Sequence, residues 1–126
     1  MNVPGDLRYS KDHEWVRSDG AVVRVGITDY AQDALGDVVF VQLPSPGDEV
    51  SASAELGEIE STKSVSEIYA PISGVVAEVN LALEDEPELV NSDPYGEGWM
   101  VAITPSEEGE LEALMDAAAY TELIEG

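Results

Sequence analysis

Proline and glycine punctuate this chain so often that long helices or long strands do not fit. Seven prolines and eleven glycines are spread over 126 residues, and the apolar runs between them are only a few residues long. Such spacing indicates many short strands joined by tight connections. Apolar residues make up 44% of the sequence, which is enough for a core. We therefore expect one mainly β domain over residues 1–126.

The beginning of the chain predicts an extended segment over residues 1–20 that leads into a hairpin. Residues 9–17 have the character of an edge strand, and Ser18-Asp19-Gly20 is a turn signal. Residues 21–27 alternate between inward and outward positions, as strands do.

A short internal helix is expected over residues 29–35. Thr28 can cap its first turn and Gly36 can end it. Tyr30 and Ala34 lie four residues apart, so they are predicted to form its buried stripe.

The middle of the chain reads as a series of strands. Residues 37–43 are the most β-branched run and predict a central strand, which the prolines of residues 44–47 end. Further strands are expected over residues 49–50, 56–60, 65–69, 75–80 and 99–103. Residues 84–95 are predicted to form a loop.

The last segment, residues 106–126, changes to a helical period. Ser106 is the expected cap of a helix whose apolar stripe continues, after a bend, into Tyr120, Leu123 and Ile124. The stripe consists of Leu111, Leu114, Met115 and Ala118.

The charge of the chain is strongly negative. There are 27 acidic and 5 basic side chains, giving a net charge of −22, and Lys63 is the one basic residue after Arg24. The electrostatic field of a protein with this net charge repels nucleic acid and anionic membranes and attracts basic protein surfaces. The acidity also fits a protein selected only for solubility or for a salty environment. In either case a nucleic-acid-binding function is excluded.

Several kinds of chemistry are excluded by composition. The chain has no cysteine and a single histidine, His13, so thiolate catalysis, multi-histidine metal sites and a conventional catalytic triad are not expected. No apolar run is long enough to span a membrane. Residues 1–10 lack the features of a signal or transit peptide, which favours a cytoplasmic protein.

Lys63 is predicted to lie at the tip of a β-hairpin. It stands within the polar segment Glu60-Ser61-Thr62-Lys63-Ser64, between two stretches of strand character. The segment has no glycine and suits a tight turn of the type I family. The simplest reading of such a lysine is an exposed loop residue that keeps a sheet edge soluble. Its isolation and its small neighbours, which leave room for an enzyme, favour a functional role.

The hairpin segment resembles the lipoyl-attachment signature of the glycine cleavage system H protein family. Gly57, Ser66, Pro71, Ser73 and Gly74 extend that resemblance around residues 60–64. The likeness runs in order along nearly the whole chain. It includes residues 7–10, 13–16, 25–41, 43–47, 91–95 and 98–100.

The resemblance implies a barrel-sandwich hybrid fold of the lipoyl/biotinyl carrier type, with a short internal helix and a C-terminal helix. It implies a non-catalytic, monomeric carrier with lipoic acid on Lys63. The carrier would take the aminomethyl group of glycine from a pyridoxal-phosphate glycine decarboxylase to a tetrahydrofolate-dependent aminomethyltransferase. An FAD-dependent dihydrolipoamide dehydrogenase would then reoxidise it. The alternative is an H-like interaction scaffold, either unmodified or acting as a lipoyl donor.

The family pattern also implies roles for residues around the lysine. Glu60 would help the lipoylating enzyme to recognise its target, beside Ser61. Thr62 and Ser64 stand where small apolar residues are more usual, so they could alter the rate of modification. No metal ligand and no catalytic residue is expected.

Four further side chains are candidates for shielding the cationic aminomethyl group. An acidic cleft can hold such a cation by charge-assisted hydrogen bonds. The candidates are Glu14, Asp12, Glu67 and His13. Ordinary solvated surface charge is the alternative reading for each of them.

Other classes of protein fit less well. A biotin carrier usually has methionine on both sides of its lysine, and a 2-oxoacid dehydrogenase lipoyl domain is shorter and belongs to a larger chain. An acyl carrier needs an Asp-Ser-Leu sequence, which does not occur. An acidic hydrolase needs a distinct carboxylate pair, and an EF-hand needs regular carboxylate spacing, and neither stands out here.

Overall fold

The computed structural model describes residues 2–107 and 109–125, and within them more residues lie in antiparallel strands than in helices. A six-stranded sheet has the order β1-β2-β3-β9-β8-β5, and a three-stranded sheet has the order β4-β6-β7. The strands of the first are β1 (Arg8–Tyr9), β2 (Glu14–Asp19), β3 (Val22–Ile27), β9 (Val101–Pro105), β8 (Gly74–Val79) and β5 (Glu49–Val50). Those of the second are β4 (Val38–Gln42), β6 (Glu55–Ser61) and β7 (Val65–Tyr69).

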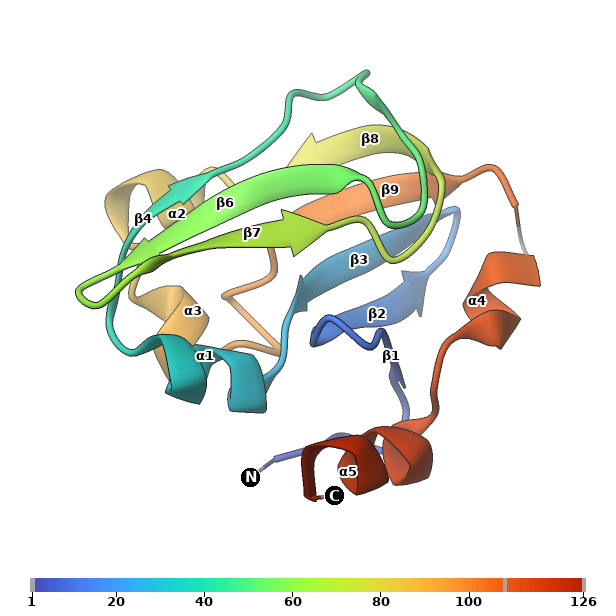
Figure 1. Cartoon of the computed structure of the whole chain (residues 1–126). Coiled ribbons are helices and arrows are strands. Elements are labelled where there is room, and N and C mark those ends of the chain that lie inside the picture. The colour runs from blue at the N-terminus through green and yellow to red at the C-terminus, as the bar shows by residue number, and fades with distance from the viewer. Residues whose placement is uncertain (1, 108, 126) are drawn as a thin grey trace.

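The two sheets form a sandwich whose apolar core lies between them (Figure 1). Val25 and Ile103 of the larger sheet belong to the same buried cluster as Ile59 and Ile68 of the smaller one. Ile59 and Ile68 each lie between two more exposed neighbours, as in a strand with one buried face. In β9 the alternation is lost, because residues 101–103 are all buried. The expected mainly β sandwich with a short internal helix and a C-terminal helix is therefore confirmed.

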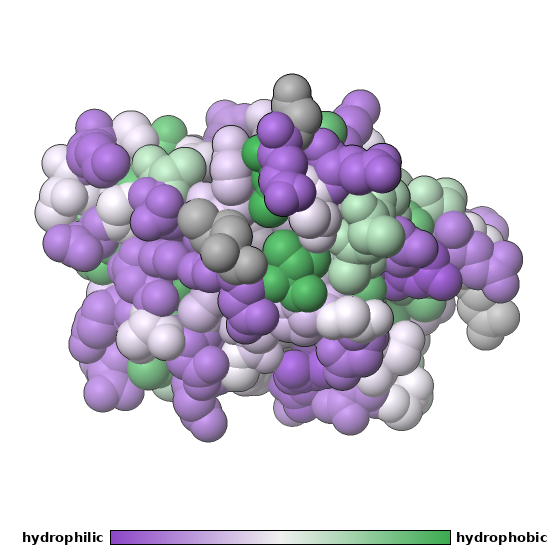
Figure 2. Space-filling model, turned by 90° about the horizontal axis from the view of Figure 1, so that it is seen from below, coloured by the Kyte–Doolittle hydropathy of each residue, from purple (hydrophilic) through white to green (hydrophobic). Residues whose placement is uncertain are grey.

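Helices cover the ends of the sandwich (Figure 1). They are α1 (Asp29–Leu35), α2 (Ala82–Asp85), α3 (Leu89–Ser92), α4 (Gly109–Ala113) and α5 (Ala117–Glu125). No helix in the described part of the chain is both long and apolar enough to cross a membrane. The face seen from below is mostly polar, with apolar side chains confined to small patches (Figure 2).

The internal helix α1 begins and ends where the sequence predicts. The hydroxyl of Thr28 accepts a hydrogen bond from the amide of Ala31 at 3.2 Å, and Gly36 closes the helix at a φ of 85°. The predicted buried stripe is wrong, because Leu35 and Ala31 pack on the core. Tyr30 is only half-buried and Ala34 is exposed, and both line a surface pocket together with Ala31 and Leu35.

Residues 37–43 do not form a central strand. Strand β4 lies at the edge of the three-stranded sheet and pairs only with β6 among the described strands. Val38 and Val41 are buried, whereas Val39 and Phe40 are each 52% exposed. The β-branched composition reflects a strand with one packed face, and composition alone does not separate an edge from a centre.

The predicted loop over residues 84–95 contains helical turns. The short helix α3 lies within it, and α2 reaches into its start. Asn91 of α3 accepts a hydrogen bond from the amide of Val38 at 2.8 Å and donates one to the carbonyl of Gly36 at 2.9 Å. A segment that lacks strand periodicity therefore fixes the connection between α1 and β4.

The C-terminal segment is two helices and not one. Between α4 and α5 the backbone of Met115 pairs with Tyr9, through bonds of 2.8 and 2.9 Å. Asp116 then precedes α5, and its carboxylate accepts a hydrogen bond from the amide of Ala119, in the first turn of that helix, at 2.9 Å. Ser106 lies before Gly109, where α4 begins, and Ala118 is exposed. Pairing with β1 interrupts the helix that the apolar spacing predicted.

A second buried cluster joins the two ends of the chain. It contains Leu7, Tyr9, Trp15 and Tyr120, and the rings of Tyr9 and Tyr120 stack with centroids 4.7 Å apart. Trp15 lies over Gly26 of the neighbouring strand, where an added Cβ would come within 2.7 Å of the indole.

Replacing Gly26 with alanine is expected to destabilise the fold by about 1–3 kcal/mol, because the indole of Trp15 must move out of a packed site. Urea unfolding followed by tryptophan fluorescence measures this change. The control is Gly5→Ala, since no atom lies within 4 Å of the Cβ that it adds. Equal stability of the two variants would contradict the packing argument.

Candidate functional site

The turn that carries Lys63 is held by its own side chains. The amide of Ser61 donates to the carbonyl of Ser64 at 2.8 Å. The Ser61 hydroxyl oxygen accepts from the amides of Lys63 at 3.2 Å and Ser64 at 3.1 Å. The amide of Thr62 donates to the carbonyl of Asp37 at 3.0 Å, which ties the tip to the start of β4. The turn is therefore fixed on both sides of the lysine.

Lys63 lies exposed at the end of the β6–β7 hairpin, as the sequence predicts. Its side chain passes over Gly36, where an added Cβ would lie 2.6 Å from the lysine Cε. The ion pairs of the described residues all involve Arg24, so none holds the Lys63 ammonium. The residue is thus accessible from solvent, and its methylene chain rests on the end of α1.

A pocket of about 270 Å³ begins beside this lysine. We call it the His13–Glu14 pocket. One wall is the β1–β2 turn and another is α1, and the hairpin closes it. Its lining residues are Asp12, His13, Glu14, Ile27, Tyr30, Ala31, Ala34, Leu35, Ile59, Ser64, Val65, Ser66, Glu67 and Ile68. The four side chains predicted from sequence to shield a cation therefore all line one pocket.

Glu14 is the buried acid of this pocket, with only 2% of its surface exposed. The Ser10 hydroxyl donates to one carboxylate oxygen, and the amide of Tyr69 donates to the other at 3.3 Å. Burial raises the pKa of Glu14 to about 7, although these two hydrogen bonds oppose the shift. A cation in the pocket would stabilise the ionised form of this carboxyl group.

His13 lies on the same wall with an unusual backbone. Its φ is 69°, in the left-handed region. Nδ1 of the ring lies 2.9 Å from the hydroxyl of Tyr120, and the ring packs on Tyr30 with centroids 4.9 Å apart. Burial lowers the pKa of His13, and the Asp12 carboxylate only partly offsets this effect. Burial therefore favours the neutral form of this histidine.

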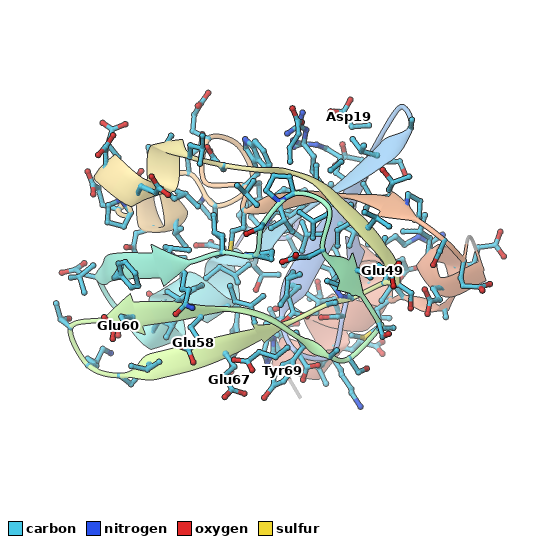
Figure 3. All side chains as sticks on the ribbon, turned by 90° about the horizontal axis from the view of Figure 1, so that it is seen from above. Asp19, Glu49, Glu58, Glu60, Glu67 and Tyr69 are labelled. Atoms are coloured by element: carbon cyan, nitrogen blue, oxygen red, sulfur yellow. The ribbon has the colours of Figure 1, made fainter. Side chains whose placement is uncertain are left out.

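Glu67 and Asp12 complete the pocket from its exposed rim. Glu67 accepts a hydrogen bond from the hydroxyl of Tyr69 at 2.7 Å. Figure 3 shows Glu67 and Tyr69 on the same hairpin as Glu60, which lies nearer the tip. Glu60 is exposed and does not line the pocket, so its surroundings differ from those of the four shielding candidates.

Sequence reasoning missed several residues that hold the pocket together. Ser10 and Tyr69 position Glu14, and Tyr120 positions His13. In the sequence these residues show at most an aromatic character or a tendency to be buried. Ordinary core residues show the same features, so nothing marked these residues as part of a site. Thr28, predicted as a helix cap, has a second role because its hydroxyl lies 2.7 Å from that of Tyr120.

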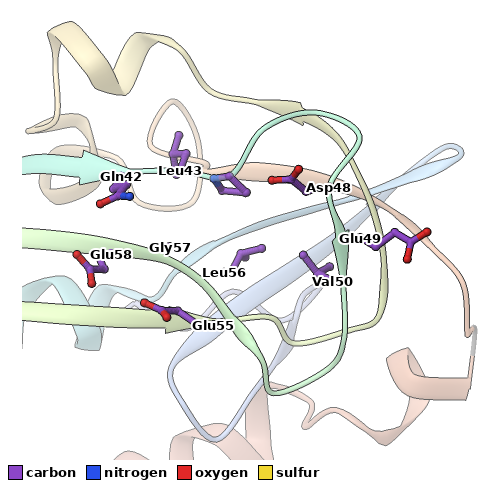
Figure 4. A pocket seen from close by; sticks show the side chains of 10 residues that line it. Gln42, Leu43, Asp48, Glu49, Val50, Glu55, Leu56, Gly57 and Glu58 are labelled. Atoms are coloured by element: carbon purple, nitrogen blue, oxygen red, sulfur yellow. The ribbon is translucent and has the colours of Figure 1, made fainter.

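A larger hollow of about 440 Å³ lies at the other end of the β4–β6 pair (Figure 4). Asp48, Glu49, Glu55 and Glu58 line it. Carboxylate oxygens of Glu55, Glu58 and Glu67 also lie within 4.8 Å of one another on the outer face. The hollow is a negatively charged surface that does not adjoin Lys63.

The comparisons with known proteins agree with this geometry. The family model for the glycine cleavage H-protein matches residues 7–126. The chain belongs to this family. H proteins of Anaeromyxobacter sp. (strain K) and Bacillus licheniformis are 58% and 54% identical to it, and each alignment covers at least 98% of both chains. A crystal structure of a glycine cleavage system H protein from Mycobacterium marinum superposes with a TM-score of 0.89. It is 45% identical and matches 98% of this chain and all of its own.

Replacing Glu14 with glutamine is expected to remove a loss of stability that the wild-type protein undergoes as the pH rises. The folded-state pKa is raised from 4.5 to about 7. The folded state therefore binds more protons than the unfolded state between these values, and the wild-type free energy of unfolding falls as the pH rises through that window. The shift corresponds to about 3 kcal/mol.

Urea unfolding at about pH 5 and about pH 7.5 tests this expectation. The variant should gain stability relative to the wild-type chain as the pH rises. Glu49→Gln, at an exposed acid on β5, serves as the control and should run parallel to wild type. A Glu14→Gln curve that also runs parallel would show that Glu14 titrates normally.

Proposed function

We propose that this chain is the lipoyl-bearing shuttle of the glycine cleavage system, with lipoic acid in amide linkage to Lys63. The observation that carries the proposal is the exposed amine on a fixed hairpin tip, directly beside a pocket lined by three carboxyl groups. The residues fit the group, because the turn presents the amine to solvent while the pocket begins at the next residue, Ser64. Membership of the H-protein family supports the same assignment.

The bound group would supply the disulfide and dithiol chemistry of a swinging arm, and this chain would supply its transport and protection. Tethering raises the local concentration of the arm at each docked enzyme. The absence of cysteine in the sequence removes any internal thiol that could exchange with the arm. The protein is a carrier in this scheme and not a catalyst.

The His13–Glu14 pocket would hold the aminomethyl cargo between enzymes. A short cation entering it meets Glu14 from inside and Asp12 and Glu67 from the rim. Binding a cation lowers the pKa of Glu14 from its raised value, so the carboxylate forms where it is needed. Charge-assisted hydrogen bonds then keep the cargo away from water.

The partners in this proposal are the glycine decarboxylase, the aminomethyltransferase and the dihydrolipoamide dehydrogenase, together with the lipoylating enzymes. The chain would work as a single-domain monomer in the cytoplasm. A net charge of −22 steers it toward basic docking surfaces and keeps identical copies apart.

Expression with lipoic acid and a lipoate ligase is expected to add one lipoyl group to Lys63. Intact mass followed by peptide mapping measures the addition. Lys63→Arg should remove it, while Lys11→Arg, at the only other lysine of the chain, should leave it unchanged. An unmodified chain, under conditions that lipoylate a known carrier, would favour the scaffold function.

The same assay tests the recognition role of Glu60. Its exposed position near the hairpin tip leaves it free to meet the ligase, so Glu60→Ala should slow lipoylation without changing stability. An undiminished rate would remove this role from Glu60. Thr62→Ala and Ser64→Ala in parallel report whether the two polar neighbours alter the rate.

Glu14→Gln is expected to shorten the lifetime of the loaded carrier, free of its partner enzymes, by about tenfold. The reason is the loss of one charge-assisted hydrogen bond in a buried site. Release of formaldehyde or ammonia from the loaded protein measures the lifetime. The Glu49→Gln variant is again the control, and equal lifetimes for both variants would exclude Glu14 from shielding.

A further inference from the structure

The hydroxyl of Tyr120 lies behind the lining of the His13–Glu14 pocket and contacts residues that belong to two of its walls. It lies 2.9 Å from Nδ1 of His13, on the β1–β2 turn. It also lies 2.7 Å from the hydroxyl of Thr28, which caps α1. Tyr120 and Thr28 are both fully buried, so water does not compete for these hydrogen bonds. A residue of the C-terminal helix thus contacts both the histidine and the helix that line the pocket.

Only one arrangement of donors and acceptors gives every hydroxyl hydrogen of this network an acceptor. The Thr28 oxygen already accepts from the amide of Ala31, and the only acceptor recorded for its own hydrogen among the described residues is Tyr120. If Thr28 donates to Tyr120, the tyrosine hydrogen must go to Nδ1 of His13. If Tyr120 donated to Thr28 instead, the buried hydroxyl hydrogen of Thr28 would have no acceptor. The free energy lost when that hydroxyl group leaves water would then not be recovered.

The direction of the chain fixes the tautomer of the histidine. Nδ1 acts as an acceptor, so the ring is neutral and carries its hydrogen on Nε2. Tyr120 does not line the pocket whereas His13 does, so the Nδ1 edge faces the protein interior. The lowered pKa of His13 supports a neutral ring. The edge of the His13 ring that faces the pocket is then Nε2–H, which can donate a hydrogen bond but has no lone pair with which to accept one.

We propose that Tyr120 is a positioning residue that holds His13 as the neutral Nε2–H tautomer, so that the pocket contains acidic oxygens and a neutral donor but no basic nitrogen. The inference deepens the shuttle function proposed above and rests on it for its biological meaning. An alkylammonium cargo in the pocket keeps its proton, because the histidine can neither accept it nor repel the cargo with a second positive charge. Glu14 remains the group that pairs with the cation.

The tautomer is measurable on the unmodified chain. His13 is the single histidine, so a long-range ¹H–¹⁵N correlation spectrum of the labelled protein contains only one imidazole. In the wild type we expect the two nitrogen signals of a pure Nε2–H ring above the histidine pKa. In Tyr120→Phe we expect averaged signals from both tautomers. The His13 pKa should also rise by about 0.5–1 unit, since the bond that favours the neutral form is gone.

The matched control is Tyr30→Phe. Tyr30 also packs on the His13 ring, but no hydrogen bond from its hydroxyl to the ring is recorded in the described residues. This variant should therefore keep the wild-type tautomer and pKa. Tyr120→Phe keeps the ring that stacks on Tyr9, and thermal unfolding verifies that both variants fold.

An Nδ1–H ring in the wild type would overturn the proposal. So would an unchanged spectrum and pKa in a folded Tyr120→Phe. Because no lipoyl group is present in this experiment, its failure leaves the function of Lys63 standing. If Lys63 proves unmodified while the tautomer is as expected, the shuttle function fails and the positioning role of Tyr120 remains.

Discussion

The apolar core between the two sheets is the constraint on which the site depends. Ile59 and Ile68 are buried against the larger sheet, so the middle of the β6–β7 hairpin cannot shift without exposing them. The tip extends beyond this core and is held by hydrogen bonds at Ser61 and Asp37. Hydrophobic burial therefore sets where the hairpin lies, and hydrogen bonds set how Lys63 is presented.

The pocket combines groups that are costly to bury. A carboxyl group at 2% exposure loses most of its hydration, and only two hydrogen bonds replace it. The cost appears as the raised pKa of Glu14, and a cationic guest would relieve it. The same burial lowers the pKa of His13 and so favours its neutral form. In the proposed function, this unfavourable burial in the free protein would favour a positively charged ligand.

Much of the fold could be predicted from short-range signals. The cap at Thr28, the stop at Gly36 and the turn around Lys63 depend on neighbouring residues, and all three occur as expected. The position of β4 at a sheet edge, and the break between α4 and α5, depend on which distant segment supplies a partner. Tyr9 supplies that partner at the break, and no local pattern in residues 106–126 contains this information.

The candidate site, like the fold, could be predicted from the sequence only in part. The acids and the histidine were predicted because an acidic cleft can hold a cationic group by charge-assisted hydrogen bonds. Their supporting residues, such as Tyr120, look like core residues until the hydrogen bonds are seen. Sequence reasoning thus found the groups that face the pocket. It missed the residues behind them, whose polar atoms serve other side chains and not the ligand.

The pairing of Tyr9 with Met115 has a consequence for the order in which the molecule folds. These two residues are far apart in the sequence, and so are His13 and Tyr120. The β2–β3 and β6–β7 hairpins, in contrast, join residues that are close in the sequence. Contacts that close a long loop cost more conformational entropy than those of a hairpin. We therefore expect β1 and the wall beside His13 to become ordered after the hairpins have formed.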